Sequence, residues 1–301
     1  MTVVSVFSAL EPPKVAVVVP TRNRKDKTLR FLEQMASQTY PTAHAIVVDA
    51  SSSDGTVEQV NQQFPNAVVL KVDDSCFWAG STNAGVRYAL SNRFDYILTI
   101  NDDSVITPTH IETLLQLAMR HACSILGNQI NYLNQPDRIW SLGAYTAWGT
   151  QNFLRLNYCD TLQQELPDSL LQQDVLETDA LPGNGVLIHR SVFEKIGLYN
   201  DVFLPHYHAD SEWVMRAKQK GFQPYVTPKV TLLNDFSIEQ KSLSFRPLLS
   251  RRTGILYTFF HKKSHLFLPA LLYIFFRYCP LRFQVRTLGA LSNRLLKMAF
   301  G

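Results

Sequence analysis

Three short polar runs carry most of the side chains that could do chemistry in the first half of the chain. Each run directly follows an apolar stretch typical of a buried strand, and the three are residues 20–24 (PTRNR), 49–55 (DASSSDG) and 101–104 (NDDS). Ligands of parallel α/β sheets bind beyond the carboxyl ends of the strands, so we expect these runs to meet at one sheet edge. The chain has no GxGxxG after its first apolar stretch and no GxxxxGK[ST], which argues against a dinucleotide fold and a P-loop.

Asp102 and Asp103 are the neighbouring carboxylates of the third run. Two adjacent negative charges at a strand end are costly unless a cation shares them. A hard divalent ion such as Mg²⁺ or Mn²⁺ is the natural partner, and it would in turn neutralise a bound diphosphate. A solvated acidic turn is the competing interpretation of this pair.

Asp210 lies just before an expected helix over residues 212–220, which a glycine ends. In that place it is either the helix N-cap or a general base. His206 and His208 precede it and could ligate a metal, although a loop histidine with ordinary partners is the more common case.

Glu212 and Trp213 occupy the first turn of the same expected helix. Glu212 either binds the hydroxyl groups of a ligand or stabilises the helix N-terminus by its charge. Trp213 belongs to the core or, at the mouth of a site, serves as a platform for a ligand.

Strand and helix patterns alternate along the first 120 residues. This alternation predicts an α/β fold, a mostly parallel sheet with helices on both faces. Residues 128–179 show weaker patterns and are expected to be irregular with short antiparallel strands. The expected strands are residues 15–19, 45–49, 68–72 and 96–100, and the expected helices are residues 29–36, 57–64, 83–90 and 111–118.

The composition is that of an ordinary globular chain, with 301 residues, 46% hydrophobic and 18% charged. It excludes a disordered protein. Four widely spaced cysteines with no CxxC pair argue against a zinc site or disulfide scaffold and fit a reducing, cytoplasmic compartment. The first 14 residues lack a basic segment followed by an apolar core, so no signal peptide is predicted.

The last 61 residues are a separate, basic piece: residues 241–301 hold eleven Lys and Arg and no Asp or Glu, leaving 18 basic against 25 acidic residues before them. Residues 266–276 are almost purely apolar but too short to span a bilayer. Their aromatic and basic flanks suit an element lying on a membrane surface, and we expect peripheral contact with the inner face of the membrane. A buried core helix with a solvated basic face is the alternative, and a nucleic-acid partner is not expected. The flanking basic residues are Lys262, Lys263, Arg277, Arg282, Arg286, Arg294 and Lys297.

Four runs, VVVPTRNR, VVDASSSDGT, WAGSTNAGVRYAL and ILTINDDSVI, follow one another in this order. With PGNGVLIHRSVFEKIGLYND and LPHYHADSEWVMRAKQKGF they resemble the family 2 glycosyltransferases of the GT-A fold, of the rhamnosyl- and galactofuranosyltransferase type. The resemblance implies a Rossmann-like domain over residues 1–240. Its nucleotide-binding part is expected at about 15–127 and its acceptor part at about 128–240, followed by an amphipathic helical extension over 241–301.

The resemblance implies inverting transfer of a sugar from a UDP- or dTDP-linked donor to a polysaccharide or lipid-linked acceptor in cell-envelope synthesis. Asp210 occupies the position of the catalytic base. Asp103, with Asp102 beside it, stands where the family binds Mg²⁺ or Mn²⁺. The implied donor residues are Pro20, Thr21, Arg22, Asp49, Asp54, Asn83, Asp102 and Asp103, and the implied acceptor residues are His208, Glu212 and Trp213.

Asn234 is a departure from the family pattern, since many relatives carry a metal-binding His after the last strand. Asn is a weaker ligand, and the following Asp235 could substitute for it. Two alternatives stay open. One is a metal-dependent nucleotidyltransferase, although PTRNR lacks the glycines of its phosphate loop. The other is a degenerate sugar-nucleotide-binding scaffold protein.

Overall fold

The computed structural model describes residues 11–235, 257, 259–264 and 266–300, without the side chains of 294–300. Its strands are β1 Val15–Thr21, β2 Ala43–Ala50, β3 Val68–Val72, β4 Tyr96–Thr99, β5 Ser104–Val105, β6 Ile125–Tyr132, β7 Gln135–Ser141, β8 Ala144–Thr146, β9 Leu154–Leu156, β10 Leu176–Glu177, β11 Val186–His189 and β12 Tyr225–Asn234. Its α-helices are α1 Lys25–Ala36, α2 Thr56–Gln63, α3 Phe77–Ser91, α4 His110–Arg120, α5 Asp168–Leu171, α6 Arg190–Ile196, α7 Ala209–Gln219, α11 Leu268–Tyr278 and α12 Leu281–Phe300.

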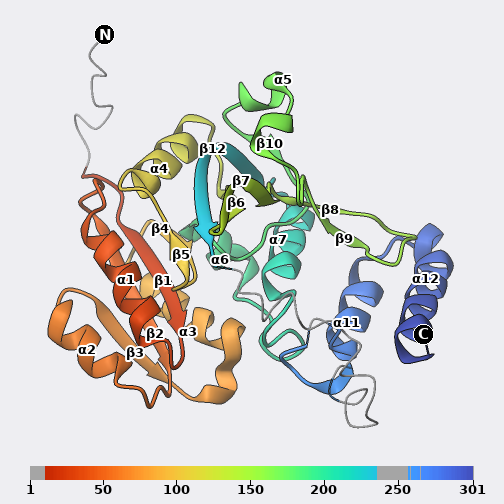
Figure 1. Cartoon of the computed structure of the whole chain (residues 1–301), viewed down its shortest axis with the longest axis horizontal. Coiled ribbons are helices and arrows are strands. Elements are labelled where there is room, and N and C mark those ends of the chain that lie inside the picture. The colour runs from red at the N-terminus through yellow and green to blue at the C-terminus, as the bar shows by residue number, and fades with distance from the viewer. Residues whose placement is uncertain (1–10, 236–256, 258, 265, 301) are drawn as a thin grey trace.

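The described part of the chain folds around one mixed sheet of ten strands (Figure 1). The strand order is β10-β12-β6-β11-β4-β1-β2-β3, with β5 beside β12 and β7 beside β6. Neighbours among β4, β1, β2 and β3 are parallel, as are β6 and β12, whereas β11 runs antiparallel between β4 and β6. The predicted mostly parallel α/β sheet is therefore confirmed.

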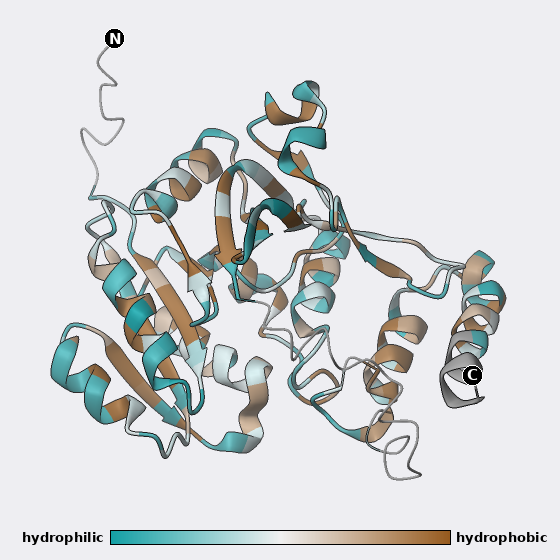
Figure 2. Ribbon diagram, in the orientation of Figure 1, coloured by the Kyte–Doolittle hydropathy of each residue, from teal (hydrophilic) through white to brown (hydrophobic). Residues whose placement is uncertain are grey.

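Alternate residues of β1 face the two sides of this sheet, and both sides are covered. Ala16 and Val18 pack in the apolar cluster that contains residues of α3 and α7. Val17 and Val19 pack in a second cluster with Phe31 of α1 and the apolar stripe of α4. Because both faces are buried, β1 is apolar at every position up to Pro20, and Figure 2 shows β1 as mostly hydrophobic.

The expectation of irregular structure from residue 128 is wrong at its start, because β6 is an eight-residue strand buried along its whole length. The polar residues Asn128, Gln129 and Asn131 hide it from a hydrophobicity pattern. Gln129 bonds Asn131 and Gln163, and Asn131 donates to the Pro136 carbonyl at 2.6 Å. Buried amides are tolerated where such bonds replace those with water.

The C-terminal helices pack on the rest of the protein. Leu271, Ile274 and Phe275 of α11 belong to the same apolar cluster as Trp213 of α7, so the inner face of α11 is part of the core, as the alternative interpretation of residues 266–276 had it. The hairpin of β8 and β9 reaches α12 (Figure 1), where the Gly149 N–H donates to Thr287 Oγ1 at 2.7 Å. Among the described residues no helix is both long and apolar enough to cross a bilayer.

Candidate active site

The three polar runs meet at one edge of the sheet, as predicted. β1 and β2 end in register, with Thr21 opposite Asp49. Thr21 Oγ1 donates to Asp102 Oδ2 at 2.8 Å across 81 positions of sequence. The loop after β1 bonds the loop after β2, since the Asn23 N–H donates to Ser52 Oγ at 2.8 Å. The parallel register of β4, β1 and β2 therefore brings these runs together.

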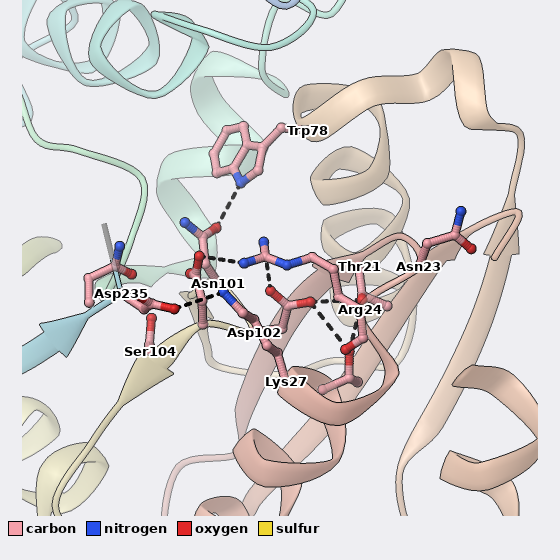
Figure 3. A network of polar contacts seen from close by, with 12 residues as sticks. Thr21, Asn23, Arg24, Lys27, Trp78, Asn101, Asp102, Ser104 and Asp235 are labelled. Carbon is pink, nitrogen blue, oxygen red and sulfur yellow. Dashed lines mark hydrogen bonds and ion pairs between the residues drawn. The ribbon is translucent and has the colours of Figure 1, made fainter. Parts of the chain in front are cut away.

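Asp102 is an internal residue of this edge, only 2% exposed. Its Oδ2 accepts from Thr21 and Thr28, and its Oδ1 lies 3.0 Å from Arg24 Nη1 (Figure 3). Burial raises the pKa of this carboxyl to about 6, although the Arg24 charge opposes the shift. Asp102 therefore anchors the loop through Oδ2, while its buried Oδ1 has the Arg24 ion pair but no hydrogen-bond partner among the described residues.

Arg24 also pairs with the second carboxylate, its Nη2 lying 2.5 Å from Asp103 Oδ2. One guanidinium between two carboxylates leaves the cluster short of one positive charge when both acids are ionised. Asp103 Oδ1 is buried and has no hydrogen-bond partner among the described residues. An unpartnered carboxylate oxygen is the kind of donor that Mg²⁺ and Mn²⁺ prefer, so Asp103 fits the role of a single metal ligand.

Other protein ligands are not gathered around Asp103, because the described residues contain no group of three His, Cys, Asp or Glu that could hold a metal. Asn234, which the resemblance puts where many relatives carry a histidine, accepts from Asn184 Nδ2 at 2.9 Å. Asp235 pairs with Lys27 at 3.0 Å. The side chains of Lys27, Asp235 and Asp103 contribute to the lining of a cavity of about 120 Å³.

Trp78, from the first turn of α3, connects this edge to the later half of the chain. Its indole Nε1 donates to Asn101 Oδ1 at 3.0 Å, as Figure 3 shows. The same ring lies against Gly183, where an added Cβ would be 2.5 Å from Trp78 Cη2 and 2.9 Å from Asp210 Cβ. Trp78 and Asp210 therefore meet at Gly183, which must lack a side chain.

Asp210 is held by two backbone donors at the start of α7. The Gly183 N–H donates to its Oδ2 at 2.6 Å and the Ser211 N–H to its Oδ1 at 2.7 Å. The helix N-cap is His208, in a left-handed conformation with φ of 67°, so the N-cap interpretation of Asp210 does not hold. Burial raises the pKa of the Asp210 carboxyl, against the lowering effect of the two N–H donors. A carboxylate fixed in this way is suited to accept a proton.

Glu212 and Trp213 lie in the core behind Asp210, both with 0% exposure. Glu212 Oε1 accepts from the Tyr278 hydroxyl at 2.5 Å and pairs with Arg216 at 3.2 Å. Trp213 donates to the Gly197 carbonyl at 2.8 Å. Neither side chain is in a position to contact an acceptor, which corrects the expectation for both. His208 is half-buried, two residues before Asp210.

Asn83 is a structural residue and not a diphosphate ligand in this arrangement. Its amide group donates to the Tyr199 carbonyl at 3.0 Å and to Asp201 Oδ2 at 3.1 Å, and its Oδ1 accepts from the Tyr199 N–H at 2.9 Å. Both of its N–H groups are thereby used. Asn83 fastens α3 to the loop after α6.

Among the remaining predicted donor residues, Asp54 and Arg22 are bonded to other protein groups, whereas one oxygen of Asp49 has no hydrogen-bond partner among the described residues. Asp54 accepts from the Lys25 and Thr56 N–H groups, which ties the starts of α1 and α2 together. Arg22 pairs with Asp74 at 2.6 Å on the surface. Asp49 binds the Ser52 N–H through Oδ2, while its buried Oδ1 has no partner in the described structure.

Sequence reasoning did not assign roles to Arg24, Trp78 and Gly183, which complete this site. Each lies inside one of the runs that carry the family resemblance, in PTRNR, in the stretch from Trp78 to Leu90 and in the run that begins with PGNG. The sequence offered only the type of each residue and its place in one of these runs, namely a second arginine in PTRNR, a tryptophan at the start of its run and a glycine in PGNG. Their partners are 23 to 105 positions away, so the pairing itself was not readable.

The strand order of the sheet and the edge at which the three polar runs meet define the GT-A class of fold. Solved structures of this fold superpose on the chain. Residues 1–349 of TarS from S. aureus, solved with UDP, superpose with a TM-score of 0.54 at 16% identity, over 81% of this chain and 65% of that TarS chain. GalNAc-T7, solved with UDP, GalNAc and Mn²⁺, has a TM-score of 0.60 at 14% identity, over 75% of this chain and 44% of its own.

The chain belongs to glycosyl transferase family 2, whose model matches residues 16–197. A Haemophilus influenzae protein described as an uncharacterized glycosyltransferase is 26% identical over 132 residues. That match spans 40% of this chain and 44% of the relative, less than half of either. The family membership predicted from the ordered runs is confirmed.

Proposed function

We propose that this chain transfers a sugar from a nucleoside diphosphate donor to a saccharide or lipid-linked saccharide, with inversion, and that Asp210 is the general base. The observation that carries the proposal is the geometry of Asp210. Two backbone N–H groups fix its carboxylate beside Trp78, and Trp78 bonds the edge that carries Asp103. The indole ring of Trp78 thus connects Asp210 to the sheet edge that carries Asp103.

Asp210 is suited to the proton transfer that the reaction needs. The acceptor hydroxyl loses its proton as its oxygen forms a bond to the anomeric carbon, and the bond from that carbon to the diphosphate breaks. Burial raises the pKa of Asp210 and makes the carboxylate a better proton acceptor at neutral pH. Attack from the face opposite the leaving group inverts the anomeric configuration.

Asp49 and Asp103 are the residues we assign to the donor. Each has a buried carboxylate oxygen without a partner in the described structure, Asp49 at the end of β2 and Asp103 after β4. Asp103 would hold Mg²⁺ or Mn²⁺, which when bound stabilises the charge that develops on the leaving diphosphate. The Mn²⁺ and UDP in the GalNAc-T7 structure and the UDP in TarS support this choice and favour UDP over dTDP.

We further propose that the acceptor is a cell-envelope saccharide and that the enzyme works at the cytoplasmic face of a membrane. The basic, acid-free sequence of residues 241–301 supports this location.

A nucleotide screen tests the proposed donor site. The melting temperature of the protein is measured with UDP, dTDP, GDP and CMP, each with and without Mn²⁺. We expect a Mn²⁺-dependent rise with UDP or dTDP, since a ligand that binds only the folded state stabilises it. Asp103→Asn should lose the Mn²⁺-dependent part of the rise. No rise with any nucleotide, in protein shown to be folded, would contradict the proposal.

A further inference from the structure

The outer face of α12 carries large apolar side chains that are exposed to solvent in the described structure. Leu281 is 84% exposed, Val285 88% and Leu288 46%. These positions are spaced four and three apart, so they form one stripe along the helix. Phe276 of α11, 71% exposed, lies before this stripe in the chain.

This stripe is not the inner face of the helix turned slightly outward. The inner face is made by other residues, with Thr287 fully buried and Leu291 6% exposed. Helix α12 therefore has an apolar contact with the body of the protein and a second apolar face toward solvent. A surface helix normally places its apolar residues only toward the core, and exposed apolar stripes mark interaction sites.

Basic side chains border the stripe. Arg277 and Arg282 are exposed, as is Arg286 one position after Val285. No Asp or Glu occurs anywhere in residues 241–301 to offset them. An apolar stripe flanked by arginines matches a bilayer surface, because the stripe enters the acyl boundary while the guanidinium groups meet anionic headgroups.

We infer that the outer face of α12, with Phe276, is a docking surface for an anionic membrane. This lipid-facing surface comprises Phe276, Leu281, Val285 and Leu288, bordered by Arg277, Arg282 and Arg286. The inference deepens the proposed function, since it names the surface through which the enzyme would reach a lipid-linked acceptor.

The surface is tied to the catalytic helix. Tyr278, between Phe276 and Leu281, donates its buried hydroxyl to Glu212 of α7, two residues beyond Asp210. The ion pair between Glu212 and Arg216 fixes the accepting carboxylate in turn. Contact with a membrane through this surface would therefore hold the start of α7 at a defined distance from the headgroups.

Co-sedimentation of the full chain with vesicles tests the inference. One vesicle set contains one-third phosphatidylglycerol and two-thirds phosphatidylcholine, and the other phosphatidylcholine alone. We expect binding to the anionic set that weakens with added salt and much less binding to the neutral set. Leu281→Gln, Val285→Gln and Leu288→Gln together should weaken anionic binding at least about tenfold. Arg277→Gln with Arg282→Gln should weaken it about thirtyfold at low salt.

Matched controls separate the surface from general effects. Met119→Gln removes an exposed apolar residue of α4, and Arg93→Gln with Arg155→Gln removes two exposed charges elsewhere. These variants should bind vesicles like the unmodified chain. All variants should keep its melting temperature and its nucleotide-induced rise, so loss of vesicle binding is distinguishable from failure of the donor site.

Two results would overturn the inference. One is vesicle binding of the triple glutamine variant equal to that of the unmodified chain. The other is a chain that sediments as a dimer, becomes a monomer in the triple variant and binds no vesicles, which would assign the stripe to a second copy.

Discussion

The backbone N–H of Gly183 donates to Oδ2 of Asp210 at 2.6 Å, across 27 positions of sequence. This bond joins the turn before β11 to the first turn of α7 and fixes one oxygen of the proposed base. The bare Cα of Gly183 also leaves the space that the Trp78 ring occupies. Gly183 thus fixes the orientation of the Asp210 carboxylate and lets the Trp78 ring lie close to it.

Gly183→Ala should therefore reduce transfer strongly in a folded protein. The new Cβ would lie 2.5 Å from Trp78 Cη2, so the ring or Asp210 must shift. Misplacement of a reacting group by about 1 Å costs about a hundredfold in rate. Transfer rate and melting temperature are measured together. Gly289→Ala, at a site with open space inside α12, is the control and should keep the transfer rate without lowering the melting temperature.

Arg24→Gln should destabilise the fold, because it leaves the buried Asp102 carboxylate without its cation. Breaking a fully buried ion pair costs about 3 kcal/mol or more. We expect a smaller loss of unfolding free energy here, because the Arg24 side chain is partly exposed. The free energy of unfolding by urea measures the loss. Adding Asp102→Asn should recover part of it. Equal losses in the single and double variants would show that the unpaired Asp102 charge is not the cause of the loss.

The sheet and the polar edge could be predicted from local sequence, and the contacts that complete the site could not. The apolar run of β1 and the apolar stripe of α4 each indicate, from their own residues alone, which positions are buried. Asn83 and Glu212 do not, since their partners Tyr199 and Tyr278 lie 116 and 66 positions away. A polar side chain near a motif has the same local sequence whether it faces a ligand or the core, and only tertiary contacts separate the two cases.

Tyr278→Phe should lower stability without changing donor binding. The hydroxyl donates to the buried Glu212 carboxylate, and a bond to a charged group contributes about 2 kcal/mol. Chemical denaturation measures the stability and titration with the nucleotide measures donor affinity. Tyr145→Phe, at an exposed position, serves as the control. Weaker donor binding at unchanged stability would instead place Tyr278 in the donor site.

His110 should make stability fall on the acid side of neutrality. Burial lowers the pKa of His110 from 6.5 to about 4, so the unfolded chain takes up a proton at a higher pH than the folded one. Stability is then full above pH 6.5 and decreases as the pH falls toward 4, by about 2 kcal/mol between pH 7 and pH 5. Urea unfolding at both values measures this. In His110→Leu the decrease should be smaller by that amount, and an unchanged decrease would assign it to other groups.

Asp210→Asn, compared with the unmodified chain, is the most direct test of the proposed function. The measured quantities are the affinity for the nucleotide that the screen identifies and the rate at which the nucleoside diphosphate is released from its sugar nucleotides. We expect folded protein, unchanged nucleotide affinity and a rate lowered about a hundredfold or more, because an amide does not take up the acceptor proton. Asp174→Asn, at a surface carboxylate paired with Arg120, should keep the full rate. A near-unmodified rate in Asp210→Asn would show that Asp210 is not the base.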